Sequence, residues 1–297
     1  MTEFLRTPDE RFNNLPGFPY APHYIEELEG FNMRMHYIDE GPSDAEHVFL
    51  CLHGQPTWSY LYRKMIPVFV SAGHRAVAPD FFGFGRSDKP IDDEIYTFDF
   101  HRESIMSFIK HLDLNNITLV CQDWGGFVGL TMPMDMPKRF SRLLIMNTML
   151  TVGDIEKYLG FLSFRKWSGE NVNYDVAMII KVQAPHLTEE ELNAYRAPFP
   201  DDRYKAGVRR FPFIVPDKPD QLGAQISQRA RDYLSNEWNG KVFMALGMKD
   251  PVLGPPIMED LRKMIRGCPE PYKIADARHF VQEWGEEVAK KALEAFK

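Results

Sequence analysis

One stretch decides the fold of this chain: Ile117-Thr118-Leu119-Val120-Cys121-Gln122-Asp123-Trp124-Gly125-Gly126-Phe127-Val128-Gly129. Its first five residues form an apolar, β-branched run, which is typical of a buried strand. A glycine-rich segment that can begin a helix follows at once, and Asp123 lies at the corner between the two. A sharp strand-to-helix turn with a reactive side chain at its corner is typical of a nucleophile elbow.

Asp123 has two interpretations. Aspartate is a favoured N-cap residue, so its role can be purely structural. As a nucleophile, a carboxylate needs no base to remove a proton, and it can displace a leaving group from a saturated carbon to form an ester. The flanking glycines favour the elbow because they permit close packing of helix against strand. Taken alone, the motif leaves both interpretations open.

The composition excludes several classes of protein. The chain has 297 residues, of which 44% are hydrophobic and 26% charged, which is ordinary for a globular protein. Its net charge of −7 argues against nucleic acid and anionic membranes as partners. No stretch predicts a signal peptide or a membrane span. The three cysteines are too few for a disulfide framework, and we expect Cys51 and Cys121 to be buried thiols. We expect a cytoplasmic monomer.

Apolar strand-like runs alternate with helical patterns along most of the chain. This alternation predicts an α/β fold with a mostly parallel, doubly wound sheet. It stops between residues 153 and 217, which are helical and rich in aromatic residues, and it resumes afterwards. We therefore expect a core formed by residues 1–152 and 218–297, with an inserted helical lid at residues 153–217.

The predicted elements follow from the same patterns. One helix, at about residues 60–70, contains Pro67, which predicts a kink or an early end. The glycine-rich loop at residues 80–88 lacks the spacing of a phosphate-binding motif and is interpreted as structural. Strands are predicted at 24–28, 33–39, 48–53, 75–79, 117–121, 143–147, 241–246 and 272–274, and further helices at 97–112, after the elbow, at 221–234 and from 283.

Three chemically reactive residues fall at the ends of predicted strands. Their order along the chain is Asp123, Asp250 and His279, which is the order of nucleophile, acid and base in an α/β-hydrolase triad. His279 would be the general base, and Asp250 would orient it and stabilise its charged form. Singly, Asp250 can be a turn residue and His279 a packed histidine. All three together favour the triad.

Donor groups are expected around Asp123. The backbone N–H groups of Trp124 and Gln55 are the expected oxyanion donors. The indole N–H of Trp124 donates and never accepts, so it suits a weakly hydrated anion such as chloride or bromide. Trp167, in the predicted lid, can supply a second indole, although plain apolar packing of the lid is, for this residue by itself, the favoured interpretation.

The chain resembles the haloalkane dehalogenases over nearly its whole length. The resemblance is closest to the subfamily typified by dichloroethane dehalogenase, in which two tryptophans hold the halide. It implies an α/β-hydrolase fold and hydrolysis of small chloro- and bromoalkanes to a primary alcohol, halide and a proton, with water as co-substrate and no cofactor or metal. The segments that carry it are His53–Pro67, Asp80–Pro90, Gln122–Gly126 and Gly247–Asp250.

The resemblance also assigns roles to individual residues. In another dehalogenase subfamily an Asn after His-Gly is the second halide ligand, but Gln55 stands there in this chain. Trp167 is therefore expected to serve with Trp124 as the halide site. Arg278, next to the base, is expected to lower the pKa of His279 by like-charge repulsion. The residues expected to line the substrate pocket are Phe127, Phe161, Phe164, Phe211, Pro212, Val215, Val252 and Leu253.

Other functions remain open on the same residues. An epoxide hydrolase of the same fold also uses an Asp elbow and a His base, but it needs lid tyrosines to protonate the epoxide oxygen. The pair of tryptophans argues against this alternative, and an intact triad argues against a non-catalytic relative. A fluoroacetate-type dehalogenase would have Arg where Trp124 stands. The lid tyrosines available to an epoxide hydrolase are Tyr158, Tyr174, Tyr195 and Tyr204.

Overall fold

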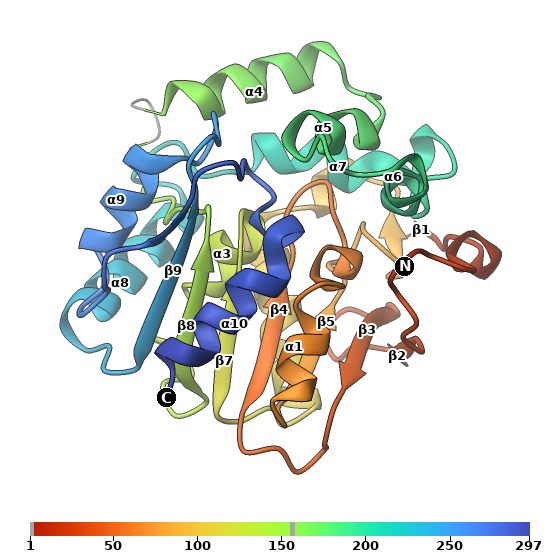
Figure 1. Ribbon diagram of the computed structural model, residues 1–297. Coiled ribbons are helices and arrows are strands. Elements are labelled where there is room, and N and C mark those ends of the chain that lie inside the picture. Colours follow the sequence, from red (N-terminus) through yellow and green to blue (C-terminus); the bar gives the residue numbers. More distant parts are fainter. Residues whose placement is uncertain (1–2, 155–157) are drawn as a thin grey trace.

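The computed structural model describes residues 3–154 and 158–297 (Figure 1). Within these residues the chain folds around an eight-stranded sheet with the strand order β10-β9-β8-β7-β4-β5-β3-β2. These strands are β2 (His23–Ile25), β3 (Met35–Glu40), β4 (Val48–Leu52), β5 (Arg75–Pro79), β7 (Ile117–Cys121), β8 (Phe140–Met146), β9 (Lys241–Gly247) and β10 (Tyr272–Ile274). A separate antiparallel pair joins β1 (Phe4–Leu5) to β6 (Lys89–Pro90).

The sheet is mostly parallel, as predicted. The strands from β5 through β4, β7, β8 and β9 to β10 pair in parallel, whereas β3 pairs antiparallel with β5 and β2 antiparallel with β3. Parallel strands need crossover connections, and helices supply them. The helices are α1 (Ile66–Ser71), α2 (Phe98–His111), α3 (Trp124–Gly129), α4 (Leu159–Glu170), α5 (Val176–Gln183), α6 (Glu189–Arg196), α7 (Ala206–Arg210), α8 (Leu222–Asn236), α9 (Pro255–Lys263) and α10 (Gly285–Ala295).

Helices cover both faces of the sheet, and the residues of β4 show how. Side chains alternate along a strand, so neighbouring residues face opposite sides. Val48, Leu50 and Leu52 pack in a core shared with α2, α3, α8 and α9. Phe49 and Cys51 pack in a second core shared with α1 and α10, which lie in front of the sheet in Figure 1. A strand covered on both faces must be apolar throughout, as β4 is.

Two local predictions were wrong. The helix expected at residues 60–70 is divided into a 3₁₀ turn, Ser59–Tyr62, and the short helix α1. Pro67 lies in the first turn of α1, where its missing N–H costs no hydrogen bond, so it begins the helix and does not end it. Helix α9 was not predicted, although Gly254 and Pro255 are suitable residues for its start.

The lid helices α4, α5, α6 and α7 lie together above the sheet (Figure 1). Thr188 caps α6, accepting from the Glu191 backbone N–H while the Glu191 carboxylate accepts from the Thr188 backbone N–H. Residues 155–157 of the predicted lid lie outside the described residues, and the domain boundaries at 152/153 and 217/218 stay predictions.

An ion pair and a buried hydrogen bond connect the lid to the core. The Arg63 guanidinium donates to both Glu283 carboxylate oxygens, at 2.8 Å each, and to Glu191 Oε1 on α6, also at 2.8 Å. The Tyr195 hydroxyl on α6 donates to Glu283 as well.

All three cysteines carry free thiols, and Cys51 and Cys121 are buried as predicted. In the described part of the chain, no helix has both the length and the apolar character of a membrane span.

Candidate active site

Asp123 lies at a strained turn between β7 and α3. Its φ of 50° and ψ of −126° are unfavourable for a residue with a side chain, and such strain is typical of active sites. Two glycines make room for the turn. A Cβ at Gly125 would approach the Leu52 carbonyl oxygen to 1.9 Å, and one at Gly54 would approach Asp123 Oδ1 to 2.4 Å. The predicted strand–turn–helix context of Asp123 is therefore present.

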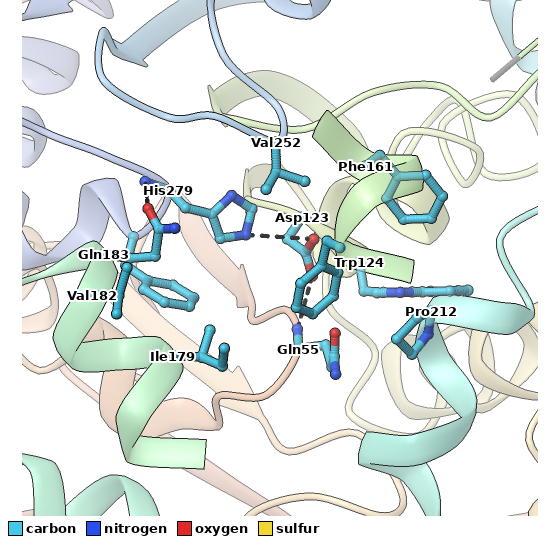
Figure 2. Close-up of a pocket in the computed structure, with 12 residues that line it drawn as sticks. Gln55, Asp123, Trp124, Phe161, Ile179, Val182, Gln183, Pro212, Val252 and His279 are labelled. Atoms are coloured by element: carbon cyan, nitrogen blue, oxygen red, sulfur yellow. Dashed lines mark hydrogen bonds and ion pairs between the residues drawn. The ribbon is translucent and has the colours of Figure 1, made fainter. Parts of the chain in front are cut away.

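The two oxygens of the Asp123 carboxylate have different surroundings. The Gln55 backbone N–H donates to Oδ1 at 2.8 Å, while Oδ2 lies 3.6 Å from His279 Nε2 (Figure 2). Trp124 is the first residue of α3, so its backbone N–H is one of those that a helix leaves without an internal acceptor. One oxygen is thus held by the chain, and the other lies toward the histidine. The oxyanion roles of Gln55 and Trp124 stay predictions.

Asp250 and His279 form a buried pair beside the nucleophile. Asp250 follows β9, and His279 lies in the segment after β10. His279 Nδ1 is 2.9 Å from Asp250 Oδ2, which also accepts from Asn147 Nδ2 at 2.9 Å. Asp250 Oδ1 accepts from the Val252 backbone N–H at 2.8 Å. The structure thus brings the three predicted triad residues together, with Asn147 as a support that the sequence analysis missed.

The surroundings of the pair favour a protonated His279 and an ionised Asp250. Burial alone would lower the pKa of His279, but the carboxylates of Asp250 and Asp123 outweigh it and raise the pKa to about 10. Burial alone would raise the pKa of Asp250, but the His279 charge and hydrogen bonds from His279, Asn147 and Val252 bring it below its usual value. The expected lowering of the His279 pKa by Arg278 therefore does not dominate.

Asp123 and His279 face a cavity of about 70 Å³ between the sheet and the lid (Figure 2). Its polar members are Asp123, His279, Gln55 and Gln183, and most of the remaining wall is apolar. A small apolar space that ends at a carboxylate and an imidazole suits a small, mostly apolar substrate. The apolar and aromatic wall consists of Trp124, Phe161, Phe164, Ile179, Val182, Pro212, Val252 and Phe280.

Half of the predicted pocket residues line this cavity. Phe161, Phe164, Pro212 and Val252 do, and they come from α4, from the segment after α7 and from the segment after β9. The other four are not part of this cavity wall in the described part of the chain; they lie almost completely buried in the apolar core, and their place in the substrate pocket stays a prediction. These four are Phe127, Phe211, Val215 and Leu253.

Packing against Trp124 explains the positions of two of these residues. The Phe211 ring centre lies 4.5 Å from the Trp124 ring centre, and that of Phe127 lies 5.3 Å away. Both rings therefore pack against the indole of Trp124 and support it from the core side. They hold in place a residue that does line the cavity.

Trp167 is not part of the cavity wall in the described structure. It is partly buried on α4, with its ring centre 6.2 Å from that of Phe164 and 5.1 Å from that of Tyr174. Apolar packing of Trp167 within the lid is therefore present, and the Phe164 ring, which lines the cavity, lies beside it. Its role as a halide ligand stays a prediction.

Four wall residues were not predicted. Ile179, Val182 and Gln183 come from α5, and Phe280 directly follows the base. Val182 is 54% exposed although it lines the cavity, which places it at the mouth. The only signal in the sequence was the apolar run of α5 within the lid, and this run does not reveal which face meets the cavity.

The lid tyrosines do not form the wall of this cavity within the described residues. Tyr174 is buried and its hydroxyl accepts from Gln55 Nε2 at 2.7 Å. Tyr195 is buried against Glu283. Tyr158 and Tyr204 are also absent from the cavity wall described here. A tyrosine pair placed to protonate an epoxide oxygen is therefore not found in this cavity.

Comparisons with known proteins agree with this geometry. A family model described as the alpha/beta hydrolase fold matches residues 47–286. A haloalkane dehalogenase of Psychrobacter cryohalolentis is 44% identical over 97% of this chain and 96% of its own length. One from Mycolicibacterium paratuberculosis is 37% identical over 97% of both chains. The solved structure of the tetrameric haloalkane dehalogenase DpaA from Paraglaciecola agarilytica NO2 superposes with a TM-score of 0.95, at 53% identity and 99% coverage of both chains.

These similarities extend over the whole triad and the lid, since they cover nearly the full length of the chain. They also agree with a sheet, an elbow and an apolar cavity that the structure shows independently. The chain belongs to the haloalkane dehalogenase family, α/β hydrolases that act on carbon–halide bonds.

Proposed function

We propose that this site cleaves the carbon–halogen bond in two steps, with Asp123 as the nucleophile. The observation that carries the proposal is the Asp123–His279–Asp250 alignment at the end of a small apolar cavity. In the first step Asp123 Oδ2 attacks the carbon that bears the halogen. The new C–O bond forms as the C–X bond breaks, and halide leaves with the bonding electrons. The product is an alkyl ester of Asp123.

In the second step water hydrolyses this ester. His279 Nε2 takes a proton from water as the oxygen attacks the Asp123 carboxyl carbon. The ester carries no charge, so one of the two carboxylates that raise the His279 pKa is lost after the first step. The first step thereby makes the base more available for the second. Asp250 stabilises the imidazolium that results. The bond between the Asp123 carboxyl carbon and the alkyl oxygen then breaks, the alcohol leaves with one proton of the water, and the other proton is released as Asp123 returns to a carboxylate. With the halide of the first step, the products are a primary alcohol, halide and a proton.

We propose Trp124 and Trp167 as the halide ligands of the two-tryptophan subfamily. Trp124 supports this because it lines the cavity beside the nucleophile. Trp167 supports it less directly, because its ring stacks on Phe164, which lines the cavity, and is not itself part of the described wall. Two N–H donors would stabilise the halide as charge develops on it in the first step.

Small chloro- and bromoalkanes are the proposed substrates. The space of about 70 Å³ limits the alkyl chain, and the apolar wall offers no cationic partner for a carboxylate substrate. The test measures halide release from a series of chloro- and bromoalkanes of increasing length, with styrene oxide as the control for an epoxide hydrolase. Release from bromoalkanes without diol formation from styrene oxide is expected. The reverse pattern would establish the alternative.

We further propose that the chain self-associates. A monomer is expected from the sequence, but one similar structure is described as tetrameric. The lid exposes apolar side chains that a monomer would leave in water, including Leu159 at 72% and Val182 at 54%. Light scattering at several concentrations tests this, and a single monomer mass throughout would contradict it. The cytoplasmic location stays a prediction.

A further inference from the structure

The base has a close neighbour that the triad does not include. Gln122 directly precedes the nucleophile and is completely buried. Its Nε2 lies 2.9 Å from Nε2 of His279 and 3.2 Å from the His279 backbone carbonyl oxygen. An amide group therefore stands within hydrogen-bond distance of the nitrogen that takes the proton from water.

The backbone carbonyl of His279 fixes the direction of this amide. A carbonyl oxygen only accepts, so the Gln122 atom that faces it must be the NH₂ nitrogen. If the amide turned over, Oε1 would stand 3.2 Å from the carbonyl oxygen, and two acceptors would meet. The cost of the observed orientation is that Gln122 Oε1 is buried without a partner among the described residues. The second hydrogen of the NH₂ group is thus available to His279 Nε2.

A donor at His279 Nε2 suits only one protonation state of the ring. Because the Nδ1–H donates to Asp250, Nε2 carries a lone pair in the neutral ring and a proton in the imidazolium. The Gln122 N–H attracts the lone pair and repels the proton. We propose that Gln122 is a positioning residue that favours the neutral, Nδ1-protonated form of His279. The inference rests on the proposed function, because that function makes His279 the base.

The other groups around His279 either favour the charged form of its ring, in opposition to Gln122, or do not contact the ring nitrogens. Asp250 and Asp123 favour the charged ring. On the α5 side, Gln183 Oε1 accepts from the His279 backbone N–H at 3.5 Å and does not touch the ring nitrogens.

Formation of the ester changes this balance. Asp123 then loses its charge, and of the two carboxylates that favour the charged ring only Asp250 still opposes the Gln122 hydrogen bond. The amide therefore has its greatest influence in the alkyl-enzyme, the state in which the base must be neutral.

The test is a titration of His279 that does not need turnover. Asp123→Asn removes the charge of the nucleophile and so imitates the ester. In this background, ¹⁵N NMR gives the His279 pKa before and after Gln122→Met, which keeps the chain length and removes both donors. We expect a rise of roughly 0.5–1 pH unit, the equivalent of one hydrogen bond to the neutral form. An unchanged or lower pKa would overturn the proposal.

Gln282 offers a matched control. It is also completely buried, its Nε2 donates to the Tyr62 hydroxyl at 3.4 Å, and its Oε1 has no partner among the described residues. Gln282→Met therefore removes a comparable buried amide three residues from the base without touching the ring. The His279 pKa should not move. An equal shift in both variants would assign the effect to general loosening and overturn the proposal.

Turnover supplies a second readout. With Asp123 intact, Gln122→Met should move the acid limb of the hydrolysis step to higher pH and leave the first release of halide in place. A merely structural role would lower the rate at every pH without moving the limb. If the parent protein releases no halide, the proposed function fails. The titration needs no turnover, so it still tests whether Gln122 lowers the pKa of His279.

A measurement without any change at Gln122 covers the case in which Gln122→Met does not fold. In the Asp123→Asn protein, at a pH where His279 is neutral, a scalar coupling should connect Gln122 Nε2 to His279 Nε2 across the N–H···N hydrogen bond. Absence of this coupling would overturn the proposal. Mass spectrometry must show in each sample that the substitution at position 123 has not reverted by deamidation.

Discussion

The two sides of the cavity are built in opposite ways. The catalytic side consists of Asp123, Asp250 and His279, which follow strands of the sheet and are held by hydrogen bonds. The lid side consists of apolar side chains on helices and turns, such as Phe161 and Ile179, which are held by packing. The comparison teaches that the sheet backbone positions the groups that react. The way in which the lid helices pack determines the shape of the space for substrate. The predictions below separate the two sides.

The largest effect is expected on the catalytic side, at the nucleophile. Asp123→Asn replaces a carboxylate with a neutral amide, which is a far weaker nucleophile. Halide release from a bromoalkane should fall by roughly 10⁴-fold or more, as when other covalent nucleophiles are removed. The measurement is the initial rate of halide release from protein whose mass has just been verified. A rate near that of the parent would show that the attacking group is another residue.

The second prediction divides the reaction between two residues of the catalytic side. Asp123 attacks as a carboxylate, so formation of the ester should not need His279, whereas hydrolysis should. His279→Phe is expected to release about one halide per active site and then to lose turnover by roughly 10²–10⁴-fold. Mass spectrometry should find one added alkyl group on the peptide that contains Asp123. An unmodified mass, or continued turnover, would contradict these roles.

The third prediction compares the two sides directly through their tryptophans. Trp124→Phe and Trp167→Phe each keep an aromatic ring and remove one N–H donor. Loss of a hydrogen bond to an ion costs about 1.5–3 kcal/mol, so halide binding should weaken by roughly 10- to 100-fold in each variant. Calorimetric titration with bromide measures this. If Trp167→Phe binds bromide as the parent does, the lid supplies its donor from another residue.

The smallest effect is expected where the two sides are joined, at Glu191. Partial burial raises its pKa, but the Thr188 backbone N–H and Arg63 bring it below its usual value. A carboxylate with a lowered pKa stabilises the fold above its unfolded pKa and loses this contribution as the pH falls. Glu191→Gln should lower the free energy of unfolding by about 1 kcal/mol at pH 7 and by much less near pH 3.

The control for Glu191 is Glu190→Gln, one residue earlier on the exposed face of α6. Urea unfolding at both pH values compares the two variants. Glu190→Gln should leave stability within about 0.5 kcal/mol of the parent, as is usual for surface changes. Equal losses in both variants would show that the contact with Arg63 does not stabilise the lid.

The sequence predicted the catalytic side far better than the lid side. Asp123 and Asp250 each follow an apolar strand, and the carboxyl ends of parallel strands meet at one edge of the sheet, so the pattern alone brings them together. Gln122 was missed because a polar residue between a strand and a nucleophile has no pattern of its own. Its role depends on the distance to His279, which is 157 positions away in the chain.

The lid side was harder because adjacent residues in a turn face opposite directions. Pro212 lines the cavity, whereas its neighbour Phe211 packs against Trp124 in the core. Val252 lines the cavity, whereas Leu253 is completely buried. A sequence shows that both members of such a pair are apolar. Only the tertiary packing around each pair determines which member meets the substrate.

The position of the lid in the chain has a consequence for the evolution of this protein. The lid helices all come between β8 and β9, while the nucleophile precedes them and the acid and base follow them. Insertions, deletions and substitutions in this interval leave the strand order and the triad unchanged. Changes within this one contiguous segment therefore reshape the wall formed by Phe161, Ile179 and Pro212, while the triad lies in the two segments that flank it.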